Sequence, residues 1–207
     1  MDVRLDAAAG TVVCEDDGCG IAPADLRLAG QRYCSSKTTR GGSLGYRGEA
    51  LSSLCAVAVV KLNTQAEGEA AHTKWVRAGQ AEAFLPEPRA RGVGTTVTVR
   101  ELFHNLPVRQ QALRATARRE LQAARVRLTR LALSHPGSAL SLTPLPSAAS
   151  GGGGRGGGGG GGGGGSVYGG GGTLQPRLKL LQTRRVLSAR QCFAHLYGDE
   201  LAQVPYI

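Results

Sequence analysis

Several features that would define a protein class are missing from this sequence. It contains no run of about twenty apolar residues, so it predicts no transmembrane helix and no membrane partner. Residues 1–10 hold neither a basic leader nor an apolar core, so no secretory signal peptide is expected there. These absences favour a globular protein that works away from membranes.

Cysteine chemistry is also poorly represented. The five cysteines are odd in number and none stands in a Cys-x-x-Cys pair, so we expect a reducing compartment and no disulfide framework. Cys192 and His195 form a Cys-x-x-His pair. A zinc site needs further ligands nearby, so the sequence predicts a packed cysteine, an unrelated histidine and no metal site.

Acidic residues are scarce as well. The chain has 15 aspartates and glutamates against 25 lysines and arginines, a formal net charge of +10. This balance favours a polyanionic partner such as nucleic acid, although an arginine-rich solvated surface explains the charge equally well.

Glycine, in contrast, is concentrated in one block. Residues 151–172 hold 18 glycines among 22 residues. Such a segment cannot bury enough apolar surface to offset chain entropy, which predicts a disordered insertion; an RNA-binding tail would need more arginine and tyrosine. We therefore expect a first domain at 1–138, a connection at 139–150, the insertion at 151–172, and the start of a second domain at 173–207.

The hydrophobic pattern predicts both strands and helices. The expected strands are Val3–Leu5, Thr11–Cys14, Val57–Leu62, His72–Val76, Ala81–Leu85 (a hairpin with the preceding strand, turning near Gly79), Thr95–Val99 and Leu140–Leu142. The expected helices open at Pro23 and span Gly48–Ala58 and Arg109–Leu133.

The first motif that carries chemistry is the acidic turn at residues 16–21, Asp-Asp-Gly-Cys-Gly-Ile. Gly18 and Gly20 let the backbone pass close to a ligand. A carboxylate held at this edge can accept hydrogen bonds from an exocyclic amine such as that of adenine. Asp17, beside the glycines, is the residue we expect to do so. An ordinary acidic turn is the alternative.

Two further motifs fit the same purpose. Lys37 lies in a Ser-Ser-Lys-Thr loop, and residues 45–51 (Gly-Tyr-Arg-Gly-Glu-Ala-Leu) open a helix whose N-terminal N–H groups can bind an anion. Glu49 in the first turn also suits the helix dipole. Thr95 and Thr96 follow Gly94 and can hydrogen-bond a base or its water, although this is also an ordinary strand start.

The order of these motifs resembles the MutL family of DNA mismatch repair proteins. The strings GYRGEAL at 45–51 and LFHNLPVR at 102–109 carry the resemblance, which covers roughly residues 3–142. Residues 29–33 and 134–136 are most similar to the third eukaryotic MutL homologue, the one associated with meiotic crossing over, with the PMS-type branches close behind.

The resemblance implies a GHKL ATP-binding fold (an α/β, or α+β, sandwich of a mixed sheet covered by helices), followed by the start of a ribosomal-S5-like transducer domain. It implies ATP and Mg²⁺ as cofactors, with partners that are DNA, another MutL homologue in a heterodimer, and MutS-type mismatch-recognition proteins, in the nucleus. The implied contacts are adenine at Asp17, its pocket at Gly18 and Gly20, phosphates at Arg47, Gly48 and Glu49, and the base region at Thr95 and Thr96. The charge of Lys37, in the Ser-Ser-Lys-Thr loop, can add a further phosphate contact.

One departure from the family concerns catalysis. The family carries a catalytic glutamate and a magnesium-binding asparagine on a helix upstream of the strand that leads to the acidic turn, and the sixteen residues before Asp17 contain no such helix. We therefore expect an N-terminally incomplete chain that has no catalytic residue of its own and does not turn over ATP. The alternatives are a catalytically dead DNA- or partner-binding module, or another GHKL protein, which residues 103–109 disfavour.

The expected long helix at Arg109–Leu133 also predicts DNA contact. Its apolar residues step by three or four along one face, and its arginines leave a strong positive charge on the rest. A solvated face around a packing stripe is the alternative. The arginines expected to contact DNA are Arg114, Arg118, Arg119 and Arg125.

Overall fold

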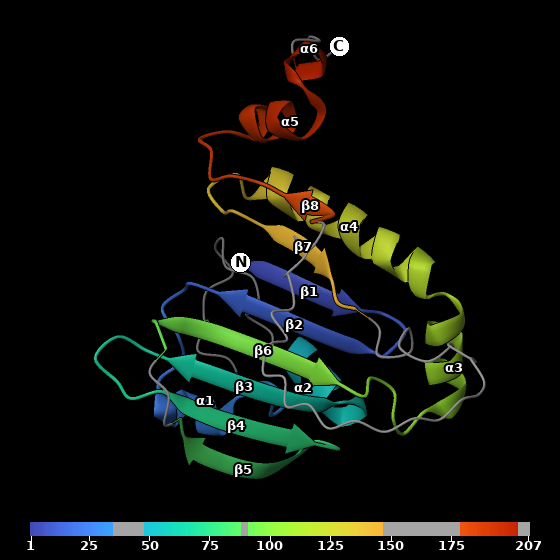
Figure 1. Cartoon of the computed structure of the whole chain (residues 1–207). Helices are drawn as coiled ribbons and strands as arrows, with labels where there is room; N and C mark the ends of the chain where they lie inside the picture. Colours follow the sequence, from blue (N-terminus) through green and yellow to red (C-terminus); the bar gives the residue numbers. More distant parts are fainter. Residues whose placement is uncertain (35–47, 88–90, 147–178, 203–207) are drawn as a thin grey trace, which may run out of the picture.

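A computed structural model describes residues 1–34, 48–87, 91–146 and 179–202. Within them, eight strands form one sheet in the spatial order β5-β4-β3-β6-β2-β1-β7-β8 (Figure 1). Every neighbouring pair is antiparallel except β1 and β7, which run parallel. The strands are β1 (Asp2–Asp6), β2 (Thr11–Asp16), β3 (Val59–Gln65), β4 (His72–Arg77), β5 (Gln80–Pro86), β6 (Gly94–Arg100), β7 (Ser141–Pro144) and β8 (Leu181–Gln182).

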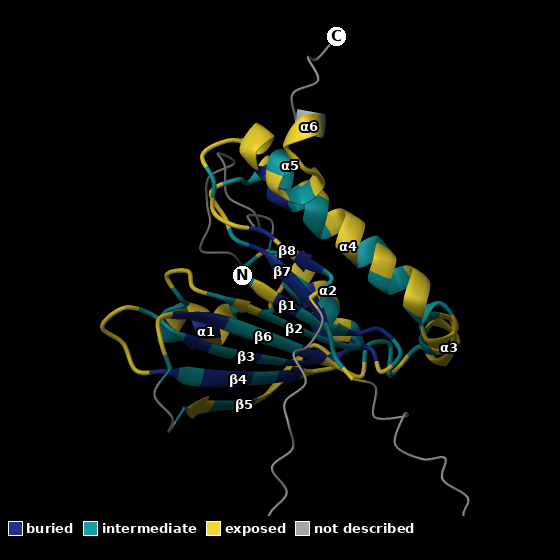
Figure 2. Cartoon of the chain, turned by 45° about the horizontal axis from the view of Figure 1, so that its top comes forward, coloured by how far each residue is buried: buried dark blue, intermediate teal, exposed yellow. Residues whose placement is uncertain are grey.

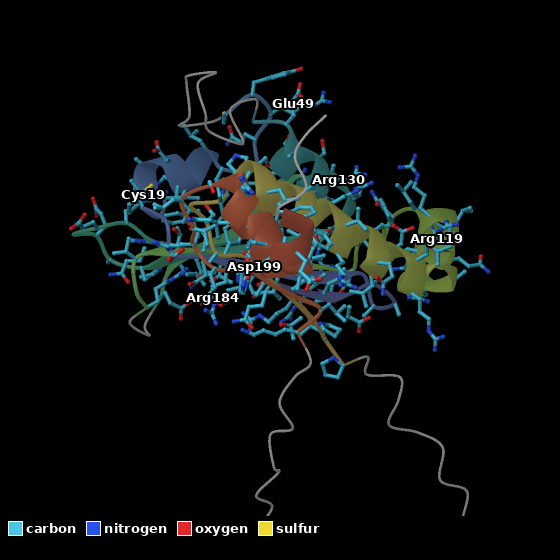
Figure 3. All side chains as sticks on the ribbon, turned by 90° about the horizontal axis from the view of Figure 1, so that it is seen from above. Cys19, Glu49, Arg119, Arg130, Arg184 and Asp199 are labelled. Atoms are coloured by element: carbon cyan, nitrogen blue, oxygen red, sulfur yellow. The ribbon has the colours of Figure 1, made fainter. Side chains whose placement is uncertain are left out.

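Helices α1, α2 and α4 lie on one side of this sheet, behind it in Figure 1 and above it in Figure 3. The helices are α1 (Pro23–Leu28), α2 (Ala50–Val57), α3 (Pro107–Ala115), α4 (Ala117–Ser134), α5 (Ala189–Tyr197) and α6 (Asp199–Ala202). The sheet with its helix layer confirms the predicted α/β fold class.

The core follows from strand alternation. On β3, Val60 and Leu62 point to the helices and are buried, whereas Lys61 and Asn63 point to the other face. One cluster packs these residues against Leu26 of α1 and Cys55 of α2. A second cluster packs the sheet against α4, and its buried strand residues, like those of the first cluster, belong to the dark blue parts of Figure 2. Its members include Val3, Leu142, Leu181, Leu121, Ala124 and Leu128.

The predicted strands, including the β4–β5 hairpin, are present. Ala78 and Gly79 both have positive φ (49° and 77°), the geometry of a tight hairpin turn whose twist matches that of the strands. The helix predicted to open at Pro23 does so, with Pro23 in its first turn.

The prediction of one continuous helix over 109–133 was wrong. The chain forms α3 and α4 with a break at Thr116, whose φ and ψ of −106° and 14° are not helical. The Thr116 hydroxyl donates to the Ala112 carbonyl (2.9 Å). A threonine that bonds back to the preceding turn favours a bend or an end of the helix, and the apolar spacing across it conceals the break.

The glycine-rich block falls between two paired strands. β7 and β8 are antiparallel partners, with Ser141 opposite Gln182. α5 then packs on α4, where the Cys192 thiol donates to the Ala132 carbonyl (3.6 Å). The predicted insertion at 151–172 lies outside the described residues, and the predicted domain boundaries stay predictions. Among the described residues, no helix has both the length and the apolar content needed to cross a bilayer.

Candidate functional site

Three strands meet at one end of the sheet and bring separate motifs together. β2 ends at Asp16, β6 begins at Gly94 and β3 ends at Gln65. Asp16 is the direct partner of Thr95 on β6, and Thr95 is the direct partner of Thr64 on β3. Directly opposed residues point to the same face, so these three side chains form a polar row on the helix-covered side.

The row is joined by hydroxyl groups. The hydroxyls of Thr64 and Thr95 are 3.0 Å apart, and that of Thr64 also donates to the Gly94 carbonyl (3.0 Å). The N–H of Ile21, just after the acidic turn, donates to the Thr64 hydroxyl (2.9 Å). Thr64 is 1% exposed. It therefore ties the acidic turn to β6, a role that the sequence did not indicate.

Glycines lie close to neighbouring atoms around the acidic turn. A Cβ at Gly94 (φ 136°) would stand 2.2 Å from the Asp16 carbonyl oxygen, and one at Gly20 (φ 71°) would stand 2.0 Å from the carbonyl oxygen of Gln65. Backbone this close leaves room only for glycine at these two positions. A Cβ at Gly18 would stand 2.8 Å from Asp16 Oδ1, an atom of a side chain. Gly18 and Gly94 thus lie against Asp16, and Gly20 lies against the end of β3.

Asp16 and Asp17 have different environments. Asp16 is half-buried, and its Oδ1 accepts the Gly18 N–H (3.0 Å). Asp17 lies beyond the end of β2, has a side chain 70% exposed, and pairs with Arg185 at 2.5 Å. Burial raises the pKa of the Cys14 thiol, and the Asp16 carboxylate on the same face of β2 raises it further.

Thr96 points away from this row. Its direct partners are Glu15 on β2 and Asn63 on β3, which belong to the opposite face of the sheet. Of the two threonines predicted near a base, the structure places Thr95 beside Asp16 and Thr96 on the face of the sheet away from the helices.

A polar hollow of about 320 Å³ opens at the edge of the acidic turn. Among its carboxylates, Glu15 pairs with Arg4 (2.9 Å), and the lining residue Arg91 donates to Asn63 Oδ1 (2.9 Å). The hollow is lined by Met1, Asp2, Glu15, Asp16, Asp17, Arg91, Gly92 and Val93.

The second predicted part of the site is the start of α2. Glu49 is the residue before the helix, and its carbonyl accepts the N–H of Ser53 (2.9 Å). Gly48 (φ 64°) packs on the backbone of Cys34, since a Cβ there would stand 2.6 Å from the Cys34 carbonyl oxygen. Lys37 and Arg47 lie outside the described residues.

A basic surface covers α3 and α4. The arginines of these helices are all exposed, and Figure 3 shows Arg119 and Arg130 projecting from α4. Glu120, an acidic residue of α4, lies 4.0 Å from Arg119. The exposed arginines are Arg109, Arg114, Arg118, Arg119, Arg125, Arg127 and Arg130.

The described residues contain no group of three or more histidine, cysteine or acidic side chains placed to hold a metal ion. Cys192 is buried between α4 and α5, where burial raises the pKa of its thiol. Its packing is that of a small apolar residue, as the sequence indicated.

Comparison with known proteins gives a consistent picture, although no family model matches the chain. Curated relatives include DNA mismatch repair protein MutL of Methylocella silvestris, 42% identical over 127 residues, and MutL of Desulforudis audaxviator, 38% identical over 151 residues. These alignments cover 58% and 68% of this chain but 20% and 26% of the relatives. The chain thus spans about a quarter or less of the length of these proteins.

Solved structures share the fold. The crystal structure of the N-terminal domain of a DNA repair protein superposes with a TM-score of 0.69 at 24% identity, covering 95% of this chain and half of that one. The Aquifex aeolicus MutL ATPase domain complexed with ADP superposes with a TM-score of 0.61 at 21% identity, covering 95% and 60%. The chain is thus similar in sequence to part of MutL DNA mismatch repair proteins, and it shares the fold of these two solved domains.

Proposed function

We propose that this chain binds an adenine nucleotide, ATP in the working protein, at the end of the sheet where β2, β3 and β6 meet. The observation that carries the proposal is the row of Asp16, Thr95 and Thr64, enclosed by Gly18, Gly20 and Gly94. A neighbour of the same fold was solved with ADP.

Within that site, we assign recognition of the base to Asp16 in place of Asp17. Asp16 lies in the row with Thr95, and its Oδ1 is already oriented by the Gly18 N–H, which leaves Oδ2 to accept the exocyclic amine of adenine. Asp17 is exposed and paired with Arg185. Thr95, rather than Thr96, then completes the base pocket.

The phosphates belong at the start of α2. Gly48 and Glu49 place backbone N–H groups there, and the dipole of the helix favours negative charge. Lys37 and Arg47 supply positive charge in the proposal. Mg²⁺, when bound, would neutralise the phosphate oxygens and orient them for hydrolysis. The complete protein hydrolyses ATP in this proposal.

The test is calorimetric titration of the chain with ATP, ADP and GTP. Binding of both adenine nucleotides with weaker binding of GTP is expected, because a carboxylate accepts from the amine of adenine and repels the carbonyl of guanine. Equal affinity for GTP would remove the assignment of Asp16, and absence of binding to any nucleotide would remove the site. Phosphate release measured with Mg²⁺ separates binding from hydrolysis.

A second activity, DNA binding, is favoured by the exposed arginines of α3 and α4. The residues we assign to it are Arg114, Arg118, Arg119 and Arg125, which would contact phosphates without reading sequence. Together with the nucleotide site, this supports a role in mismatch repair on DNA.

The finer identity follows from the sequence resemblance. We propose a nuclear protein of the branch associated with meiotic crossing over, on the basis of residues 29–33 and 134–136. It would act as a heterodimer with another MutL homologue, together with MutS-type proteins. Co-purification from meiotic nuclei, with mass spectrometry of the bound proteins, tests this; recovery without any MutL homologue would contradict it.

A further inference from the structure

Lys74 is a charged side chain in the interior of the helix-covered face. It lies on β4, is 3% exposed, and its Nζ donates to the carbonyl oxygens of Arg27 (2.6 Å) and Ala29 (2.8 Å). These carbonyls belong to the C-terminal end of α1, where backbone acceptors have no partner within the helix and a cation is favoured. Burial lowers the pKa of the ammonium group, an effect that the neighbouring Cys55 and Cys34 oppose.

The segment that follows α1 continues directly from these carbonyls. Its first part lies on α2, since Gly30 (φ 88°) is so close that a Cβ would stand 3.1 Å from the Cys55 sulfur. Its end, Cys34, lies against Gly48 at the start of α2. Residues 29–34 therefore connect the contacts of Lys74 to the backbone at Gly48.

We propose that Lys74 is a positioning residue, which holds the end of α1 so that residues 29–34 stay against α2 and the backbone at Gly48 and Glu49 keeps its geometry. Its consequence for ligand binding rests on the proposed function, because that backbone is the phosphate part of the nucleotide site. The anchoring itself does not depend on any ligand.

A buried ammonium is expensive to desolvate, and the two carbonyls would lose their donors without it. A methionine fills nearly the same volume but donates nothing, so Lys74→Met tests the hydrogen bonds separately from the packing. Lys61→Met is the matched control. Lys61 lies on the other face of the sheet, with its Nζ 5.5 Å from the centre of the Trp75 ring, and the change in charge is the same.

Two buried cysteines report the result. Cys55 (0% exposed) lies beneath Gly30, whereas Cys192 (1% exposed) lies between α4 and α5. Each variant is labelled with a thiol reagent under native conditions, and the rate at each cysteine is measured by peptide mass spectrometry. Lys74→Met is expected to raise the rate at Cys55 by about tenfold or more, within the range of local opening equilibria, without changing Cys192.

Gly30→Ala should have the same effect as Lys74→Met, because it displaces the same segment and leaves the charge untouched. Equal acceleration at Cys55 and Cys192 in Lys74→Met would show that Lys74 supports the whole fold, and unchanged labelling at Cys55 would show that it anchors nothing; either result overturns the proposal.

Nucleotide affinity is measured on the same variants by titration with ADP. Lys74→Met is expected to weaken binding about tenfold, a usual size for coupling between linked sites, while Lys61→Met binds as the unmodified chain does. Exposure of Cys55 with unchanged ADP affinity would overturn the link to the site. If the unmodified chain binds no nucleotide, the proposed function fails, and the labelling experiment still decides whether Lys74 anchors residues 29–34.

Discussion

Two adjacent carboxylates at the acidic turn lie in different environments. Asp16 is held in the row with Thr95 and by the Gly18 N–H, whereas Asp17 extends outward to Arg185. Neighbouring residues at a strand end can differ in this way because the chain leaves the pleat between them.

The residue-level prediction is a comparison of two substitutions. Asp16→Asn keeps an oxygen for the Gly18 N–H but cannot accept the amine of adenine with a charge, so it should weaken ATP binding by about 1–3 kcal/mol. Asp17→Asn should leave the affinity unchanged. Calorimetry measures both, with circular dichroism to check the fold. Loss of affinity in Asp17→Asn alone would return the role to Asp17.

A second prediction concerns pH. Burial raises the pKa of the Cys192 thiol above its ordinary value of 9.0, so above this pH the unfolded chain loses a proton that the folded chain retains. The free energy of unfolding should therefore fall as pH rises above 9.0, by up to about 1.4 kcal/mol per pH unit for one proton. The raised pKa values of Cys14 and Cys55 likewise lower the free energy of unfolding at alkaline pH, whereas the lowered pKa of Lys74 has the opposite effect.

Cys192→Ala should reduce this alkaline slope. Urea unfolding at a series of pH values measures it. The alanine variant is less stable throughout because of lost packing, so only the slope is diagnostic. An unchanged slope would mean that Cys192 ionises equally in both states.

At the residue scale, the sequence predicted only those structural roles that a residue type indicates by itself. The glycines of the acidic turn indicate that two backbone segments approach closely, and the structure has such an approach at Gly20. Thr64 gave no signal because a threonine in a β-branched strand is ordinary, and only pairing with Thr95 gives it a role. Lys74 gave none because a lysine on a strand is expected in solvent.

At the scale of turns and helices, two glycines in turns can be compared. Gly20 (φ 71°) and Gly68 (φ 73°) have nearly the same backbone conformation, but a Cβ at Gly20 would clash with the Gln65 carbonyl while one at Gly68 would meet nothing within 4 Å. Comparing the stability lost on substitution of Gly20 and of Gly68 therefore separates the cost of a positive φ from the cost of the close approach at Gly20.

Gly68→Ala should destabilise the fold by about 1 kcal/mol, the usual cost of a non-glycine residue in the left-handed region. Gly20→Ala should cost about 1–3 kcal/mol more, because the backbone must shift. Denaturant unfolding of both variants checks the difference. Equal losses would mean that the turn at Gly20 moves freely, and would argue against a preformed site.

For the helices, the prediction is salt-dependent DNA binding. Reversal of Arg118 and Arg119 to glutamate should weaken binding to duplexes of any sequence and reduce the slope of affinity against salt. The matched control reverses Arg32 and Arg184, two exposed arginines that lie outside α3 and α4, with the same change in net charge. Equal loss in both variants would assign the effect to net charge.

Element types were largely predictable, but helix continuity was not. The apolar stripe through Leu113, Leu121 and Leu128 is compatible with one helix or with two. The break depends on the Thr116 hydroxyl and on where α4 meets the sheet, which are not encoded in spacing. Likewise, a two-residue strand such as β8 has too few residues for a periodic pattern.

Across the whole molecule, β1 is the strand that unites the chain. It pairs with β2 on one side and with β7 on the other, joining residues near position 2 to residues near position 141. β7 then pairs with β8 across 36 intervening residues (145–180).

The corresponding prediction is that a shorter connection stabilises the fold. Replacing residues 146–179 by Asn-Gly leaves a loop of about four residues, and the lower loop-closure entropy should raise the free energy of unfolding by about 2 kcal/mol. A Gly/Ser segment of the original length is the control and should leave stability unchanged. Destabilisation by the short loop would show that residues 146–179 make contacts that the fold needs.

The distance between β7 and β8 also matters while the protein is being made. Ribosomes add roughly 5–20 residues per second, so β8 emerges roughly 2–7 s after β7. During that interval β7 is an outer strand with one row of backbone groups exposed, which is the surface through which immature chains join one another. The long connection therefore also affects the newborn chain, in its need for chaperones and its tendency to aggregate.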